Sequence, residues 1–164
     1  NLGELPPQQL DLISGGELKS WLVSTRSAQE FGAVSNGTEV SSWGHESMRS
    51  PEVLAGKLPE RDALKALGTG LYLSNLHYCN WSDVQTARVT GMTRYACFWV
   101  ENGEITAPIK DLRFNVSLFN ILGEDLEAVT AETHIEPATE TYFNRALGGA
   151  VVPGMLMNRF TFTL

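Results

Sequence analysis

The chain has 164 residues, of which 43% are hydrophobic and 19% are charged, and its formal net charge is −7. This composition is that of one ordinary globular domain over 1–164, and it excludes a disordered or fibrous segment. Lys and Arg are scattered, and no apolar run approaches the roughly 20 residues that span a bilayer, so we expect no direct nucleic-acid or membrane partner.

The first predicted elements are a strand and a short helix. β-branched and aromatic residues over 17–26 predict the strand, and the helix that follows is capped by Ser27 and stopped at Gly32. From 33 to 57 the sequence is rich in Ser, Gly, Asn and Pro. It therefore predicts a long irregular connection within the domain, of a length that is usually functional or mobile.

A second helix and two strands follow. The first turn of a helix accepts proline, and residues 59–68 begin with proline and end with glycine. They therefore predict a helix of about two to three turns. Strands are predicted over 71–76 and, after a polar stretch, over 94–100, the latter apolar enough to be buried on both faces. Asn102 and Gly103 then form the pair that a type I′ turn demands, which predicts a hairpin into a strand at 105–109.

The C-terminal third predicts one more helix and further strands. Ser117 precedes an apolar helical pattern through 118–122, and residues 126–135 show strand-like alternation. The last strands are expected on either side of Pro153-Gly154. These elements indicate an α+β fold with a curved mixed or antiparallel sheet, as a partial barrel or a sandwich, and about three short helices.

The ends and the cysteines indicate the origin of the chain. It begins at Asn1 without a methionine and ends on an alternating run at 159–164, so we expect a cut start and a natural end. Cys79 and Cys97 are too few for a disulfide framework and lack the C-x-x-C spacing of a zinc site. Reduced thiols in the cytoplasm are the simplest interpretation.

The histidines do not complete a metal or catalytic motif. His45-Glu46 could begin the H-E-x-x-H of a zinc protease, but Arg49 and Ser50 stand where the second histidine is needed. His134 lies near the end of a predicted strand, where a solvated or carboxylate-paired histidine is the common case. We therefore assign no catalytic residue and no metal ligand within the chain.

A peptide groove is the remaining candidate site. His77 and Cys79 would share one face of a strand, but nothing nearby supplies a third ligand. His77, Tyr78, Arg94 and Trp99 are instead candidates for lining a groove, because aromatic side chains give large contact areas at low entropic cost. The alternative for the aromatic residues is ordinary core packing.

Four segments together resemble the TldD/PmbA family, also known as modulators of DNA gyrase. They are G-E-L-K-S-W-L-V-S-T-R-S-A-Q-E-F-G at 16–32, G-T-G-L-Y-L at 68–73, T-G-M-T-R at 90–94, and F-W-V-E-N-G-E-I at 98–105 with Pro108 following. The resemblance covers about two thirds of the chain, in the family's order and approximate spacing. It implies that the chain is the C-terminal part of a longer metalloprotease-related protein.

The resemblance also implies a zinc-dependent peptidase, with zinc held by an H-E-x-x-x-H helix of the catalytic TldD-like subunit. That motif is absent here, and the stretch 142–152 lacks the cysteine that such subunits offer near the C-terminus. The chain is therefore similar to the PmbA-like (TldE-like) members, and no residue qualifies as a zinc ligand. The implied partners are its own N-terminal domain, a TldD-like subunit in a homo- or heterodimer, and an unfolded peptide.

Two alternatives remain open. The protein could be a binding or regulatory protein that acts on a toxin or on gyrase without peptidase work. Alternatively, an upstream part of the same polypeptide could hold H-E-x-x-x-H, which would make it an active peptidase with an altered third ligand.

Overall fold

The computed structural model describes residues 7–40, 44–48, 50–139 and 148–163. The chain divides into two compact units. The smaller unit comprises Asn1–Val53 with Ile135–Val152, and the larger unit comprises Leu54–His134 with Pro153–Leu164. No helix in the described residues is both long enough and apolar enough to cross a membrane.

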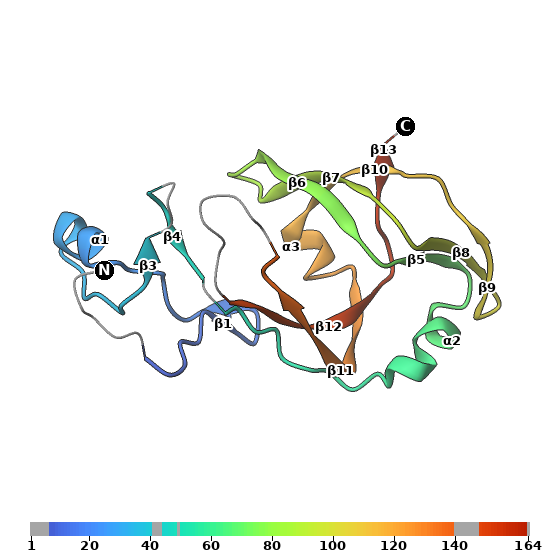
Figure 1. The fold of residues 1–164 in the computed structure, drawn as a ribbon, viewed down its shortest axis with the longest axis horizontal. Helices are drawn as coiled ribbons and strands as arrows, with labels where there is room; N and C mark the ends of the chain where they lie inside the picture. Colours follow the sequence, from blue (N-terminus) through green and yellow to red (C-terminus); the bar gives the residue numbers. More distant parts are fainter. Residues whose placement is uncertain (1–6, 41–43, 49, 140–147, 164) are drawn as a thin grey trace. The chain divides into compact units, whose positions relative to one another are not determined.

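Besides the ends of two long strands, the described residues of the smaller unit form two short hairpins and one helix. Its elements are β1 (Ile13–Ser14), β2 (Glu17–Leu18), α1 (Thr25–Phe31), β3 (Glu39–Val40) and β4 (Glu46–Ser47), with β1 paired to β2 and β3 to β4 (Figure 1). Between β1 and β2, Gly15 and Gly16 have positive φ values of 60° and 79°, as a tight turn of this kind requires. In the connection predicted as irregular, the β3–β4 hairpin and a bridge between Glu52 and Val151 are the regular pairings among the described residues.

Two predictions for this unit are wrong. The strand expected over 17–26 ends at Leu18. The Lys19 N–H still donates to the Leu12 carbonyl at 2.7 Å, and further along Asn36 replaces a partner strand: its Oδ1 accepts from the Val23 N–H at 3.0 Å and its Nδ2 donates to the Trp21 carbonyl at 2.7 Å. The helix cap is Ser24 rather than Ser27, since the Ser24 hydroxyl accepts from the Ser27 N–H.

The larger unit contains most of the strands. It holds η1 (Glu60–Asp62), α2 (Ala63–Leu67), β5 (Gly70–Leu73), β6 (Leu76–Asp83), β7 (Arg88–Thr93), β8 (Cys97–Glu101), β9 (Glu104–Pro108), β10 (Arg113–Ser117), α3 (Leu118–Ile121) and β13 (Phe162–Thr163). The long strands β11 (Leu126–Pro137) and β12 (Gly149–Met157) pair with each other and run through both units.

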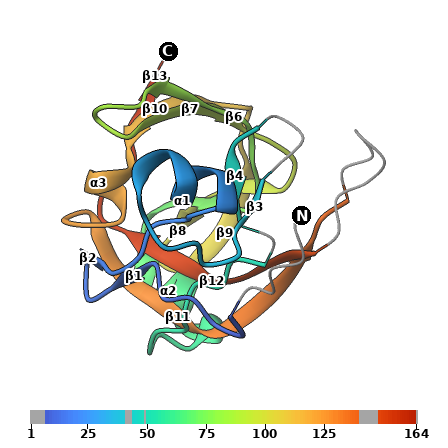
Figure 2. The same cartoon turned by 90° about the vertical axis from the view of Figure 1, so that its left-hand side faces the viewer.

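The strands of the larger unit form antiparallel sheets that curve (Figure 2). One sheet has the order β13–β10–β7–β6, and another has the order β5–β8–β9. The predicted α+β class, with antiparallel strands and three short helices, is confirmed. The described strands do not close into a barrel.

A small aromatic cluster forms the core of the larger unit. Phe114 and Val116 on β10 and Ile121 on α3 are buried, and Phe114 meets Phe160 edge-on with ring centroids 5.2 Å apart. Gly91 on β7 leaves room for this ring, since a Cβ there would lie 2.6 Å from the Phe114 Cζ. The core therefore ties β7, β10 and α3 together.

Several strands differ from the sequence predictions. The polar stretch expected before 94–100 folds as the β6–β7 hairpin, and β10 was not predicted. β8 starts only at Cys97, and the predicted burial on both faces is partial: Cys97 and Val100, which point to opposite faces, are buried, whereas Trp99 is 36% exposed. β12 passes through Pro153-Gly154 as one strand.

The connection from β8 to β9 packs against the end of α2. Asn102 and Gly103 have φ values of 52° and 82°, the backbone of a type I′ turn. The Gly103 N–H donates to the Gly68 carbonyl at 2.7 Å, and Gly68 itself ends α2. The predicted helix over 59–68 forms as a 3-10 turn, η1, followed by α2.

Candidate functional site

His77 and Tyr78 lie side by side on the outer strand of the four-stranded sheet. Their ring centroids are 4.3 Å apart, His77 is half-buried, and Tyr78 is 68% exposed. The register of β6 on β7 shifts between His77 and Asn80, and Tyr78 has a φ of 51°. Such a bulge re-aims side chains, which accounts for two neighbouring rings meeting on one strand.

Arg94 and Trp99 lie apart from each other on different elements. Arg94 follows β7, where its N–H donates to the Asn75 carbonyl at 3.1 Å and its guanidinium lies 5.1 Å from the centroid of the exposed Tyr95 ring. Trp99 belongs to β8, and its Nε1 donates to Glu101 at 2.8 Å. No hydrogen bond or ring contact among the described residues joins Trp99 to His77, Tyr78 or Arg94.

The described side chains do not fit the zinc site that the family resemblance implies. Cys79 is exposed and Cys97 is buried, and neither is in a disulfide. Although Cys79 is exposed, the partial burial of its thiol raises the pKa of that thiol, which disfavours the thiolate form that binds metal. Across the described ranges, no three His, Cys, Asp or Glu side chains gather as a metal-binding group.

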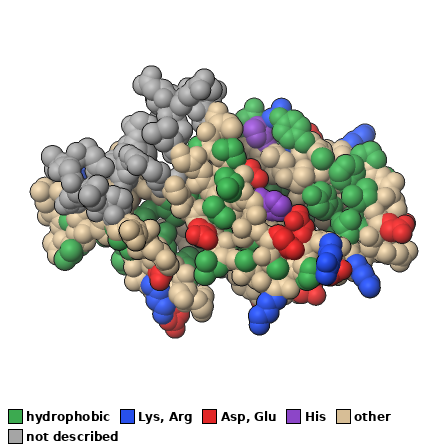
Figure 3. Space-filling view, turned by 60° about the horizontal axis from the view of Figure 1, so that its bottom comes forward, with side chains coloured by type: hydrophobic (Ala, Val, Ile, Leu, Met, Phe, Trp, Pro, Cys, Tyr) green, Lys and Arg blue, Asp and Glu red, His purple; other side chains and the backbone are tan. Residues whose placement is uncertain are grey.

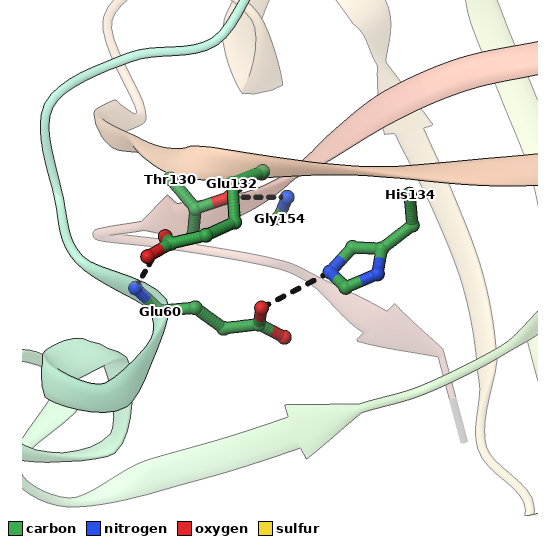
Figure 4. Close-up of polar contacts among 5 residues, drawn as sticks. All are labelled: Glu60, Thr130, Glu132, His134 and Gly154. Atoms are coloured by element: carbon green, nitrogen blue, oxygen red, sulfur yellow. Dashed lines mark hydrogen bonds and ion pairs between the residues drawn. The ribbon is translucent and has the colours of Figure 1, made fainter.

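The nearest approach to such a group joins η1 to β11 (Figure 4). His134 Nε2 lies 3.1 Å from Glu60 Oε2, and the Glu60 N–H donates to Glu132 Oε2 at 2.8 Å. Each carboxylate is thus occupied by a direct contact rather than turned toward a common ion. The prediction of a carboxylate-paired histidine at position 134 is confirmed. Both side chains of the pair are about half exposed, so it contributes little stability.

Glu46 forms the most strongly perturbed group, on β4 of the smaller unit. Its carboxylate accepts hydrogen bonds from the hydroxyls of Ser27 and Ser24, the latter at 2.7 Å. These bonds, from Ser27 first and Ser24 second, lower the pKa of Glu46 to about 2. The group fastens the start of α1 to β4, so its arrangement is structural, with no nucleophile–base pair.

A polar recess of about 230 Å³ opens beside the core of the larger unit. Its lining combines two arginines, one buried acid and several uncharged polar side chains: Arg88, Asn115, Val116, Ser117, Asn120, Ile121, Asp125, Arg159 and Thr161. Arg88 Nε donates to Asn115 Oδ1 at 3.2 Å, and Arg159 lies 3.1 Å from Asp125 Oδ1 and 3.6 Å from Glu124. The charge of Arg159 is therefore compensated by carboxylates of this chain, whereas Arg88 is held by the uncharged Asn115.

Sequence reasoning missed this recess because it missed β10. The signal was present in the alternation of apolar Leu112, Phe114, Val116 and Leu118 with polar residues. That alternation places Asn115 and Ser117 on the face away from the core, where they line the recess.

Comparisons with known proteins agree on one family. A family model described as the PmbA/TldA metallopeptidase C-terminal domain matches residues 5–164. Metalloprotease PmbA from Escherichia coli O157:H7 is 31% identical over 127 residues, which are 73% of this chain and 26% of that protein. The chain thus spans about a quarter of the length of this relative.

Two solved structures share the fold. TldE from Thermococcus kodakarensis superposes with a TM-score of 0.68 and 17% identity, over 88% of this chain and 31% of that one. A Thermotoga maritima protein described as a candidate modulator of a DNA gyrase gives a TM-score of 0.65 and 17% identity, over 89% of this chain and 31% of its own.

Proposed function

The chain belongs to the PmbA/TldD metallopeptidase family, as its C-terminal domain, and from this premise we propose that it forms a peptide-binding wall in a zinc peptidase assembly. The zinc ligands come from outside residues 1–164, because the H-E-x-x-x-H motif is absent from them. A TldD-like subunit supplies the zinc, which places this chain with the non-catalytic PmbA-like members. Two cysteines outside any disulfide suit a reducing compartment such as the cytoplasm.

The outer strand β6 is the observation that carries the proposal. It is eight residues long and largely exposed, and it lies at the end of its sheet. An extended peptide can add to such an edge through main-chain hydrogen bonds, which suits a substrate that is recognised by backbone rather than by sequence. Tyr78 and Trp81, which are 68% and 58% exposed, then offer aromatic surface to the peptide side chains.

The register shifts of β6 limit how much of it a peptide could pair with. Shifts occur between His77 and Asn80 and between Trp81 and Asp83. Bulges of this kind blunt an edge against uncontrolled pairing. The proposed contact is therefore short, and the aromatic side chains carry much of the affinity.

The test uses the full-length protein together with a TldD-like subunit and an unfolded peptide substrate. Replacing Tyr78 and Trp81 together by alanine should raise KM for cleavage about thirtyfold and leave kcat near the wild-type value, because each of the two stacking contacts contributes roughly 1 kcal/mol. Phe119→Ala, at an exposed aromatic on α3, is the matched control and should leave KM unchanged.

Zinc analysis of the separately purified subunits tests the assignment of roles. Zinc is expected in the TldD-like subunit and not in the full-length form of this protein. Stoichiometric zinc in this protein would instead identify an active peptidase whose upstream part holds the ligands. An unchanged cleavage rate when this protein is added would remove the assembly role.

The second candidate is a regulatory protein that acts on a toxin or on gyrase. This candidate is suggested by the description of the Thermotoga maritima protein, which shares the fold of this chain. A change in gyrase supercoiling caused by the full-length protein alone, without peptide cleavage, would favour this candidate over the first.

A further inference from the structure

The β5–β8–β9 sheet carries apolar side chains on both of its faces. Residues paired across antiparallel strands point to the same side of a sheet. The pairing therefore places one row on the first face, Tyr72, Phe98 and Pro108, and a second row on the opposite face, Leu71, Trp99 and Ala107. Sheets with one solvated face alternate apolar and polar residues, whereas runs that are apolar on both sides are typical of strands buried on both sides.

This chain covers the centre of the sheet, where Cys97 and Val100 are buried and Leu71 and Phe98 are half-buried, but it leaves the rest of both rows accessible. Tyr72 is 42% exposed and Trp99 is 36% exposed, and Pro108 and Ala107, one on each face, are exposed as well. Every residue of β9 is exposed, and β9 is an outer strand. On the face shown in Figure 3, hydrophobic side chains gather at the right-hand end, where Figure 1 places β8, β9 and α2. Residues 1–164 therefore do not bury all the apolar side chains on the two faces of this sheet.

We infer that the β5–β8–β9 sheet is an interface covered on both faces by the part of the same polypeptide that lies outside residues 1–164. The matched part of the PmbA relative is only 26% of that protein, so much chain is left to provide the cover. A second copy joined through one two-fold contact would cover one face and leave the opposite face in water. Apolar rows left exposed beside an open edge strand would favour aggregation.

Thiol labelling of the full-length protein tests the inference. In a background with Cys79→Ser, single cysteines replace Tyr72 on one face and Ala107 on the other, and Val84→Cys in the exposed β6–β7 turn serves as the control. Both test thiols should react at least about tenfold more slowly than the control, at every protein concentration. Reaction at the rate of the control would overturn the inference, and protection lost on dilution would overturn it in favour of a second copy.

Hydrogen exchange of the unmodified full-length protein gives a readout that does not depend on the variants folding. The β9 amides that point away from β8 should exchange much more slowly than those of the β6–β7 turn at 84–86, at both high and low protein concentration, since the amides paired with β8 are protected with or without cover. Equal exchange in the two segments would show that β9 is an open edge in the whole protein and would contradict the inference. Neither measurement depends on peptide binding at β6, so the inference about the β5–β8–β9 sheet can fail while the proposed function holds.

Discussion

At the scale of single residues, Ser24 and Ser27 show where local sequence is insufficient. Both are serines at plausible cap positions, and Gly32, with a φ of 65°, ends the helix where the sequence predicts. Ser24 has the extended backbone of a cap, with φ −76° and ψ 166°. Its hydroxyl also donates to Glu46, 22 positions further along the chain. The cap could not be chosen from sequence because this contact is tertiary.

The same contact predicts a pH-dependent stability. The pKa of Glu46 is about 2 in the folded chain and 4.5 in its ordinary state, so the charge stabilises the fold above about pH 4.5, and this contribution is lost as the pH falls toward 2. Glu46→Gln should therefore lower the melting temperature at pH 6 and have a smaller effect at pH 3.5. Thermal melts of the full-length protein check this, with Glu30→Gln on α1 as the control for losing one charge. An equal effect at both pH values would contradict the prediction.

At the scale of elements, the strands that were predicted carry β-branched residues or a clear turn pair, whereas β10 was missed in spite of its alternation. β11 was found by its β-branched residues, and the β8–β9 hairpin by its turn pair. β6 was missed because most of its residues are exposed and several are polar. It is a strand because β7, which follows after a short turn, pairs with it, and this pairing leaves little trace in side chains that are mostly exposed.

An extended segment beside β11 provides a prediction at this scale. Gly56 N–H donates to the Thr130 carbonyl at 2.7 Å, and a Cβ at position 56 would lie 2.2 Å from the Val129 carbonyl oxygen. Because backbone must then move, Gly56→Ala should cost about 2 kcal/mol of stability. Hydrogen exchange over 126–131 in the full-length protein should accelerate. Gly70→Ala, whose nearest atom is the flexible end of Leu67 at 3.0 Å, should cost less.

At the scale of the whole molecule, composition and strand-rich patterning were enough for the α+β class, and ordered motifs were enough for the family. The division into two units was not visible, because β11 and β12 run as unbroken strands through both. The candidate groove residues illustrate the same limit. His77 and Tyr78 meet on one strand, whereas Trp99 lies on another sheet, and sheet membership is decided by long-range pairing.

Because the buried cluster is small, the larger unit should depend heavily on one side chain. Phe114 is 2% exposed and contacts β7 and the C-terminal aromatics, so Phe114→Ala should cost about 3–5 kcal/mol. Phe119→Ala, at a 70% exposed ring on α3, should cost less than about 0.5 kcal/mol. Denaturant unfolding of the full-length protein, followed by hydrogen exchange in β7 and β10, measures both. Similar losses for the two variants would show that the core lies elsewhere.

The hydroxyl of Thr130 joins β11 to β12 through two backbone groups. It is buried, it donates to the Glu132 carbonyl at 2.9 Å, and it accepts from the Gly154 N–H at 2.8 Å, next to Pro153, which has no N–H to offer. Valine has nearly the same shape but would remove the hydrogen-bond partner of both backbone groups. We therefore expect a hydroxyl at position 130 to be retained wherever β12 keeps Pro153-Gly154, because this hydroxyl is the acceptor for the Gly154 N–H.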